Sequence, residues 1–162
     1  MITAERLREL LYYGQETGVF RWRVPRQGVS VGDVAGGPDF WGYWKIGIDG
    51  KKYSAHRLAW LYVHGAWPTT DIDHIDRRKS NNAIENLRVA TDTQNLMNAK
   101  TRSDNRSGYK GVCFEAGRNK WRAGISIDGR YVNLGRFSTP EVAHAAYCAA
   151  ATKHYGEFAC FG

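Results

Sequence analysis

The sequence predicts an α+β fold built from two modules. Residues 19–24 and 121–127 alternate apolar and polar side chains, which is typical of half-buried strands. Asp-Gly pairs at 49–50 and 128–129 are strong signals for hairpin turns, so both halves contain antiparallel strands. Residues 99–107 are polar, basic and almost free of apolar side chains. We therefore expect one module at 1–98, a basic linker at 99–107 and a second module at 108–162.

The composition excludes several classes of protein. Apolar residues make up 43% of the 162 residues and charged residues 24%, as in ordinary globular proteins. The mean hydropathy is −0.52, and no apolar run approaches the length of about 20 residues that a membrane span needs. The first residues contain no apolar segment typical of a secretory signal. Cys113, Cys148 and Cys160 form no C-x-x-C pair, so we expect free thiols in a reducing compartment and no cysteine zinc site.

Positive charge is concentrated in one stretch of the chain. The formal net charge is +7, and residues 99–140 hold nine basic and three acidic residues, a net +6. Such a patch is suited to a polyanion, although a merely solvated face is the alternative. Residues 71–98 beside it are slightly acidic and supply the oxygen ligands that a metal site needs.

The first module combines helices with short strands. Thr3 can cap a helix over 3–13, in which Leu7, Leu10 and Leu11 share one face. The remaining elements expected in this module are, in chain order, a strand at 19–24, a loop-rich segment at 25–42, strands at 43–48 and 52–55, a helix at 56–65 ended by Gly65, and a last helix capped by Thr91 or Asp92.

The second module is expected to be a three-stranded antiparallel sheet with one helix packed against it. The strands lie within residues 109–137, and Trp121 is interpreted as a core residue. Ser138 and Glu141 form a capping box that predicts the start of the helix. Alanines along this helix keep it slim enough to lie close to the sheet, and His144 and Tyr147 are interpreted as packing residues.

The residues suited to catalysis lie between 71 and 98. Asp73 and His74 are adjacent, Asn86 follows His74 by 12 residues and Asn95 follows it by 21. Neutral histidine can accept a proton from water near physiological pH, and aspartate and asparagine oxygens suit Mg²⁺. A base beside such a cation is the arrangement that hydrolysis of a phosphodiester requires. The alternative is an inert site, with Asp73 as a cap and the asparagines as turn residues.

This segment resembles the HNH nuclease motif, also called the ββα-metal or His-Me finger fold. The matching residues are Asp73-His74, Asn86-Leu87-Arg88 and Gln94-Asn95, and the likeness extends over about residues 40–98, with the core at about 70–98. The resemblance implies that His74 is the general base and that Asn86 orients it. It also implies that Asp73 and Asn95 hold one divalent metal, Mg²⁺ first and Mn²⁺ as the alternative. We interpret Asn81 and Asn82 as loop residues and His56 as structural.

The second module resembles the AP2 DNA-binding domain. The likeness rests on Ser107–Val112, Lys120–Ala123, Leu134–Phe137 and Glu141–Tyr147. It implies that the sheet enters the major groove of double-stranded DNA. Cys113 and Glu115 depart from the arginines common in plant members, so the plant recognition sequence does not transfer. The residues predicted to contact DNA are Lys110, Arg118, Lys120, Arg122, Tyr131 and Arg136.

Together these features predict a DNA endonuclease similar to homing endonucleases of phages and other mobile elements. One centre per chain favours nicking, by a monomer or a DNA-bound dimer, with no membrane and no obligate protein partner. If the gene is a phage gene, we expect the protein in the cytoplasm of a bacterial host. The alternatives are a non-catalytic AP2-like transcriptional regulator that keeps a degenerate HNH scaffold, and a structural protein that packages DNA.

Overall fold

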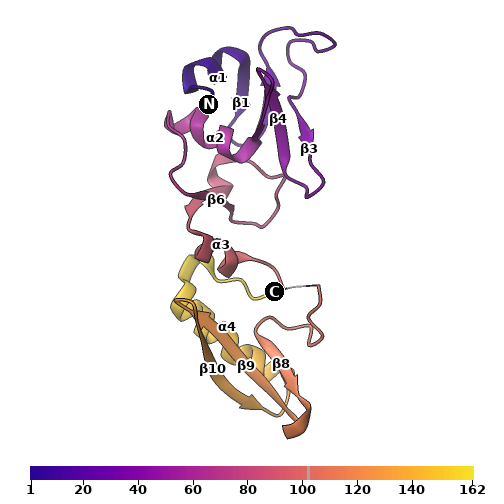
Figure 1. Ribbon diagram of the computed structural model, residues 1–162, viewed down its shortest axis with the longest axis vertical. Coiled ribbons are helices and arrows are strands. Elements are labelled where there is room, and N and C mark those ends of the chain that lie inside the picture. Colours follow the sequence, from indigo (N-terminus) through magenta and orange to yellow (C-terminus); the bar gives the residue numbers. More distant parts are fainter. Residues whose placement is uncertain (102) are drawn as a thin grey trace. The chain divides into compact units, whose positions relative to one another are not determined.

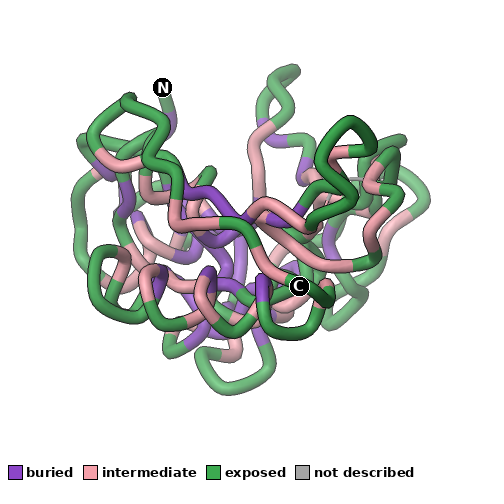
Figure 2. Tube along the Cα trace, turned by 90° about the horizontal axis from the view of Figure 1, so that it is seen from below, coloured by how far each residue is buried: buried purple, intermediate pink, exposed green. Residues whose placement is uncertain are grey.

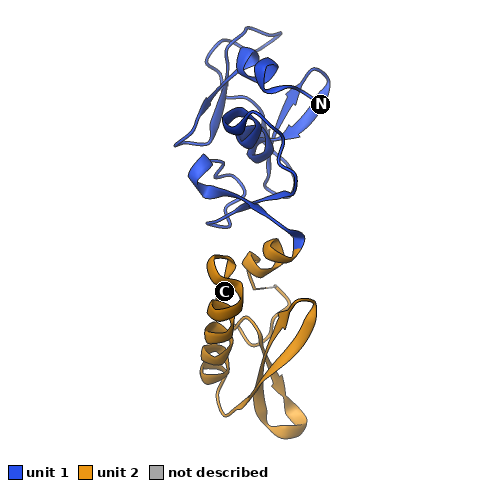
Figure 3. Ribbon diagram, turned by 90° about the vertical axis from the view of Figure 1, so that its left-hand side faces the viewer, with its two compact units in different colours: residues 1–92 blue, residues 93–162 orange. Residues whose placement is uncertain are grey.

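A computed structural model describes residues 1–101 and 103–162 and divides the chain into two compact units. These are residues 1–92 and 93–162, blue and orange in Figure 3. The division falls earlier than the predicted linker at 99–107. One reason is that Lys110 reaches back along the chain: its Nζ donates to the carbonyl oxygen of Met97 at 2.9 Å and to that of Ala99. The segment that follows residue 92 is therefore bonded to the second unit.

The first unit contains two helices and three small sheets (Figure 1). A hairpin of β1 and β2 forms one sheet, strands β3, β4 and β5 form the next, and β6 pairs with β7. Its elements are α1 (Ala4–Leu10), β1 (Leu11–Gly14), β2 (Val19–Trp22), β3 (Gly37–Pro38), β4 (Trp44–Ile48), β5 (Lys51–Ser54), α2 (Ala55–His64), β6 (Asp71–His74), η1 (Ile84–Asn86) and β7 (Leu87–Ala90).

The helix predicted over 3–13 is shorter than expected. Thr3 caps α1 as predicted, but the helix ends at Leu10, and the next four residues form β1. Leu11 and Tyr13 are buried while Tyr12 between them is exposed, which is the alternation of a strand. Leu11 pairs with Trp22 on β2 in an antiparallel ladder. Local helix propensity cannot predict such pairing between distant residues.

One apolar core holds the first unit together. Leu7 of α1, Phe20 of β2, Ile46 of β4 and Leu58 of α2 are all buried in it. Buried positions are purple in Figure 2, and exposed turns are green. Ile72 of β6 joins the same core, so the strand that carries Asp73 and His74 is anchored on the packed interior.

The second unit is an antiparallel sheet with one long helix. The sheet has the order β10-β9-β8, and α4 packs against it through Ala143, Tyr147 and Ala151. Gly111 approaches the ring of Tyr147 so closely that a Cβ there would lie 2.1 Å from it. The elements are α3 (Asp92–Asn98), which begins at the unit boundary, β8 (Val112–Glu115), η2 (Ala116–Arg118), β9 (Lys120–Ile127), β10 (Arg130–Phe137), α4 (Pro140–Tyr155) and η3 (Gly156–Phe158).

The start of α4 differs by one residue from the prediction. Thr139, not Ser138, is the N-cap, and its hydroxyl accepts a hydrogen bond from the amide of Val142. Pro140 then occupies the first helical position, where its missing N–H costs nothing. None of the helices in 1–101 and 103–162 has the length and apolar character needed to cross a membrane.

Candidate active site

The hairpin of β6 and β7 carries the predicted catalytic pair. The strands are antiparallel, with Asp73 opposite Arg88 and His74 opposite Leu87. Asp73 and His74 point to opposite faces of the strand, as successive residues do, yet both are buried. Burial of two polar residues in succession requires partners on both sides of the hairpin.

Asn82 contacts the imidazole of His74. Its Oδ1 lies 3.2 Å from Nε2 of His74, and its Nδ2 donates to the carbonyl oxygen of Ser80. Because Nδ2 is directed to Ser80, the atom facing the ring is an acceptor, and this network assigns the proton of the neutral imidazole to Nε2. Nδ1 of His74 is then the nitrogen without a proton.

The hairpin of β1 and β2 holds Asn82 in place. The hydroxyl of Tyr13 donates to the carbonyl oxygen of Asn82 at 2.6 Å, and the amide of Ile84 donates to the carbonyl of Gln15. Gly18, with a positive φ of 71°, packs against the backbone of Asn82 so tightly that a Cβ would lie 2.4 Å from its carbonyl carbon. Sequence reasoning left Asn82 out, because nothing local shows that residues 13–18 brace it.

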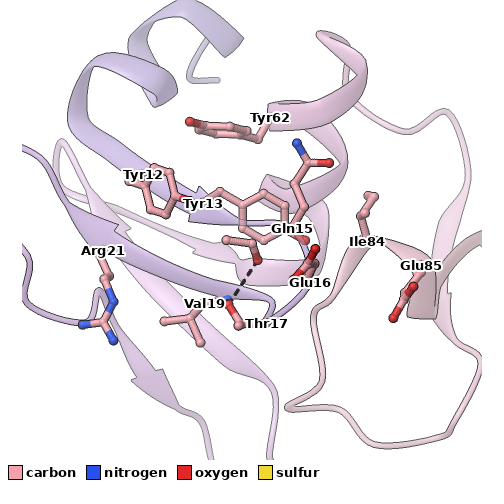
Figure 4. Close-up of a pocket in the computed structure, with 11 residues that line it drawn as sticks. Tyr12, Tyr13, Gln15, Glu16, Thr17, Val19, Arg21, Tyr62, Ile84 and Glu85 are labelled. Carbon is pink, nitrogen blue, oxygen red and sulfur yellow. Dashed lines mark hydrogen bonds between the residues drawn. The ribbon is translucent and has the colours of Figure 1, made fainter.

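A surface pocket of about 850 Å³ adjoins this brace. Tyr13, Gln15 and Ile84 line it, and Figure 4 shows them with Tyr62 around the space. Neither Asp73 nor His74 lines the pocket. The predicted catalytic pair therefore lies on the β6–β7 hairpin, outside this pocket.

Asn86, which the resemblance implied orients His74, bonds the loop that follows His74. Its Oδ1 accepts from the amide of Asp76, and its Nδ2 donates to Asp76 Oδ1 and to the carbonyl oxygen of Asn81. Its own carbonyl accepts from the amide of Ile75. Asn86 thus closes the loop that follows His74, while Asn82 contacts the ring. Asn81 belongs to the same loop, since its Nδ2 donates to Asp76 Oδ2.

Arg88 anchors Asp73. Its Nη2 and Nε lie 2.8 and 3.0 Å from Oδ2 of Asp73, and both side chains are only 11% exposed. The paired positions on β6 and β7 place the two groups directly opposite each other. A carboxylate held by a guanidinium in this way has a defined orientation.

His56 and Tyr43 form an aromatic cluster with His74. The ring centroid of His56 lies 5.1 Å from that of His74, edge to face, and Tyr43 lies 5.6 and 6.2 Å from His56 and His74. Nδ1 of His56 is buried without a hydrogen-bond partner in the part of the chain that the structure describes. Burial lowers the pKa of His56 to about 3, and His74 acts in the same direction. His56, interpreted from sequence as structural, packs directly on the predicted base.

The protonation state of His74 suits a base. Burial lowers the pKa of His74 below its ordinary 6.5, although the hydrogen bond with Asn82 and the carboxylates of Asp76 and Asp73 act in the opposite direction. The balance favours the neutral imidazole at physiological pH. A neutral ring is the form that can take a proton from water.

The predicted metal ligands lie in different units. Asp73 is on β6, and Asn95 is on α3, beyond the boundary between the units at residue 92. Within residues 1–101 and 103–162, no group of three or more His, Cys, Asp or Glu side chains could hold a metal ion.

Most residues predicted to contact DNA gather on the face of the sheet opposite α4. On β9, Arg122 alternates with the buried Ala123, and cross-strand pairing puts Arg136 beside Arg122. Glu115 lies among the cations, 2.6 Å from Arg136, 3.2 Å from Arg122 and 3.8 Å from Arg118. Lys120 lies opposite Glu115 in the register. Cation contacts with Glu115 lower its pKa, with the hydrogen bond from Arg136 as the largest cause.

Tyr131 belongs to the same face, whereas Nζ of Lys110 bonds backbone carbonyls. The ring of Tyr131 lies over Gly124, so a Cβ added at Gly124 would lie 1.9 Å from the Tyr131 hydroxyl. The guanidinium of Arg122 lies 5.5 Å from the centroid of the Tyr131 ring. Nζ of Lys110 instead donates to the carbonyls of Met97 and Ala99. Lys110 therefore bonds the end of α3. The sequence alone could not distinguish this contact from a contact with phosphate.

Comparisons with known proteins agree with the geometry of the hairpin. The family model "HNH endonuclease" matches residues 53–97. Protein 3.8 of Escherichia phage T7 is 34% identical over 112 residues, which cover 68% of this chain and 92% of that protein. The uncharacterized HNH endonuclease L560 of Acanthamoeba polyphaga mimivirus is 33% identical over 116 residues, 70% of this chain and 59% of that protein.

A solved structure also resembles the chain. It is described as "DNA binding and cleavage by the HNH homing endonuclease I-HmuI", with 22% identity and a TM-score of 0.43 over 86% of this chain and 76% of that one. The match to residues 53–97 includes β6, η1, β7 and the start of α3, the elements that carry the predicted site. From the family match and the two viral relatives we conclude that this chain belongs to the HNH endonuclease family and is a nuclease.

Proposed function

We propose that the protein is a metal-dependent DNA endonuclease that nicks one strand at a site located by its second unit. The observation that carries the proposal is the Asp73–His74 pair, with the ring of His74 oriented by Asn82 at 3.2 Å. The phage relative supports a further part of the proposal, that the protein acts in the cytoplasm of a bacterial host.

His74 acts as the general base. With its proton on Nε2 directed to Asn82, Nδ1 takes the proton from the water that attacks the scissile phosphate. The imidazolium that forms is stabilised because Oδ1 of Asn82 continues to accept the hydrogen bond from Nε2. Asn86 and Asp76 keep the loop after His74 closed, so the ring stays at the end of β6.

Asp73 and Asn95 would hold the metal ion. Their donor set, one carboxylate and one amide oxygen, fits Mg²⁺ or Mn²⁺. A cation bound there supplies stabilisation of the negative charge that develops on the phosphate and on the leaving 3′ oxygen. Arg88 orients the Asp73 carboxylate for this purpose.

The second unit provides the affinity for double-stranded DNA. Arg122 and Arg136 share one face of a three-stranded sheet with Lys120 and Tyr131, and such a sheet fits the major groove. We propose that this face acts as an AP2-like module. Most of its contacts would be to phosphate and would position the nuclease without reading sequence. One centre per chain supports nicking rather than a double-strand break.

A plasmid assay tests the proposal. Supercoiled plasmid is incubated with the wild-type protein in Mg²⁺ and in EDTA, beside the variants His74→Ala and His64→Ala. His64 is an exposed histidine at the end of α2 and serves as the matched control. Open-circle DNA that requires Mg²⁺, is kept by His64→Ala and is lost by about 10²–10⁴-fold with His74→Ala supports the proposal.

Other products lead to other conclusions. Linear DNA as the first product would contradict nicking and indicate paired action on both strands. Intact plasmid together with a salt-sensitive gel shift would favour the non-catalytic DNA-binding regulator.

A further inference from the structure

Two aromatic side chains are exposed on the turn between β3 and β4. Phe40 is 94% exposed and Trp41 is 69% exposed. Their rings contact each other edge to face, with centroids 5.6 Å apart. Large aromatic side chains in a globular unit are ordinarily packed, so a pair of them in solvent marks a contact surface. We call Phe40 and Trp41 the aromatic turn.

The backbone of this turn is well ordered by hydrogen bonds. Oδ1 of Asp39 accepts from the amides of Trp41 and Tyr43, at 2.9 Å each. The amide of Asp39 donates to the carbonyl of Tyr43, and Nζ of Lys79 donates to the carbonyl of Trp41 at 3.2 Å. The two rings are thus presented on a preorganised backbone, which lowers the entropy lost on binding.

The aromatic turn lies beside the catalytic pair. Tyr43, two residues after Trp41, has its ring centroid 6.2 Å from that of His74. Two residues span at most about 7 Å of chain, and bases in a strand are about 3.4 Å apart. A phosphate held at His74 would therefore have the aromatic turn within a few base pairs of it.

The charges around the turn favour a nucleic acid as the partner. Nζ of Lys79 lies 4.5 Å from the Tyr43 centroid and Nζ of Lys45 lies 5.8 Å from it. The acidic residue of the turn, Asp39, is 3.8 Å from Lys45 and accepts the backbone amides described above. Cations and aromatic rings next to a nuclease centre match phosphates and bases.

We propose that Phe40 and Trp41 insert between base pairs next to the scissile phosphate and unstack them. This inference rests on the proposed DNA endonuclease function and extends it to how the substrate is deformed. His74 is buried on its hairpin, so the DNA backbone has to move out of its regular path to reach the ring. Apolar wedges that unstack a base step kink the duplex and provide that movement.

Permanganate oxidation of thymines tests the wedge directly, because it reports unstacked bases. Nicks made by the wild type on a supercoiled plasmid are first mapped by primer extension. His74→Ala protein is then bound to the same plasmid, and thymine reactivity is compared with that of Phe40→Ala/Trp41→Ala/His74→Ala. Tyr12→Ala/His74→Ala is the control, since Tyr12 is an exposed aromatic residue on β1 of the same unit.

We expect reactive thymines within a few base pairs of the nick with His74→Ala and with the Tyr12 control, and their loss in the triple variant. With His74 intact, Phe40→Ala/Trp41→Ala should nick about 10- to 100-fold more slowly. With Phe40 intact, Trp41→Phe should keep most of the wild-type nicking rate, whereas Trp41→Ala should nick more slowly. Unchanged melting temperatures confirm that these exposed substitutions leave the fold intact.

Two negative results are distinguishable. If the wild type nicks and Phe40→Ala/Trp41→Ala nicks equally fast with the same reactive thymines, the wedge is overturned and the endonuclease stands. If the wild type makes no nicks in Mg²⁺ or Mn²⁺, the proposed function fails and the wedge fails with it.

Discussion

His74 and Asn82 meet through Nε2 and Oδ1 at 3.2 Å, although His74 ends β6 and Asn82 lies in the loop between β6 and η1. Asn82 is 2% exposed and is held by the hydroxyl of Tyr13 and by close packing of Gly18. The orientation of His74 therefore depends on the β1–β2 hairpin, whose Tyr13 precedes Asn82 by 69 residues. This relationship connects the core of the first unit to the chemistry of the HNH motif.

The first prediction concerns Asn82. Asn82→Ala removes the acceptor that holds the Nε2 proton, so we expect plasmid nicking to slow about 10- to 100-fold, within the contribution of a general base. Asn82→Asp keeps an acceptor and adds a negative charge, which raises the pKa of His74. The acid limb of its rate–pH profile should then move to higher pH. Asn81→Ala, which alters the loop without touching the ring, serves as the control.

The second prediction concerns the ion pair between Arg88 and Asp73. Arg88→Ala leaves the nearly buried carboxylate of Asp73 without its guanidinium, so we expect a loss of about 3 kcal/mol in the free energy of unfolding. Arg6→Ala breaks the ion pairs of an exposed arginine with Glu9 and Asp49 and should cost less than about 1 kcal/mol. Urea denaturation at pH 7 measures both. Equal losses would contradict the anchoring role of Arg88.

The third prediction concerns the pH dependence of stability. The pKa of His56 is about 3 when folded and near 6.5 when unfolded, so the unfolded chain binds the extra proton between these values. The stability that this contributes is fully present above pH 6.5 and declines as the pH falls toward 3. The slope should reach about 1.4 kcal/mol per pH unit at most. His56→Gln should flatten the urea-denaturation profile between pH 6 and 4, whereas His64→Gln should leave it unchanged.

The fourth prediction concerns the sheet face of the second unit. Arg136→Ala should weaken binding to duplex DNA and reduce the slope of log affinity against log salt by about 0.9 for each phosphate that the variant no longer neutralises. Glu115→Gln should strengthen binding, because it removes the negative charge among three arginines. Fluorescence anisotropy over a salt series measures both.

Lys153→Ala is the matched control for this face, since Lys153 is exposed on α4, and α4 packs on the other side of the sheet. It should leave the salt slope unchanged. A Lys153 effect as large as that of Arg136 would indicate that net charge, and not the sheet face, governs binding. Lys110→Ala should lower stability more than it changes the slope, because Lys110 bonds the carbonyls of Met97 and Ala99 at the end of α3.

Periodic patterns and turn residues predicted most elements because their causes are local. The strands predicted at 43–48 and 52–55 from alternation and the Asp-Gly turn lie at 44–48 and 51–54, within one residue, and α2 is capped by Gly65 in the left-handed conformation. The predicted end of the first helix at residue 13 was wrong, because pairing of Leu11 with Trp22 outweighs a helical pattern of leucines. The cap at Thr139 differs from the prediction because Pro140 sets where the helix starts.

The sequence by itself determined the chemical equipment of this nuclease: adjacent Asp73 and His74, the HNH spacing, and a basic module with strand periodicity. These follow from residue types and short spacings. Only the tertiary structure decided that Asn82 contacts His74, that Asn86 and Lys110 bond backbone groups, and that His56 and Tyr43 pack against His74. The reason is physical: the side chain of an asparagine or lysine can hydrogen-bond either to the backbone of a loop or to a group in the site. Neighbours that are distant in sequence determine which of these bonds it makes.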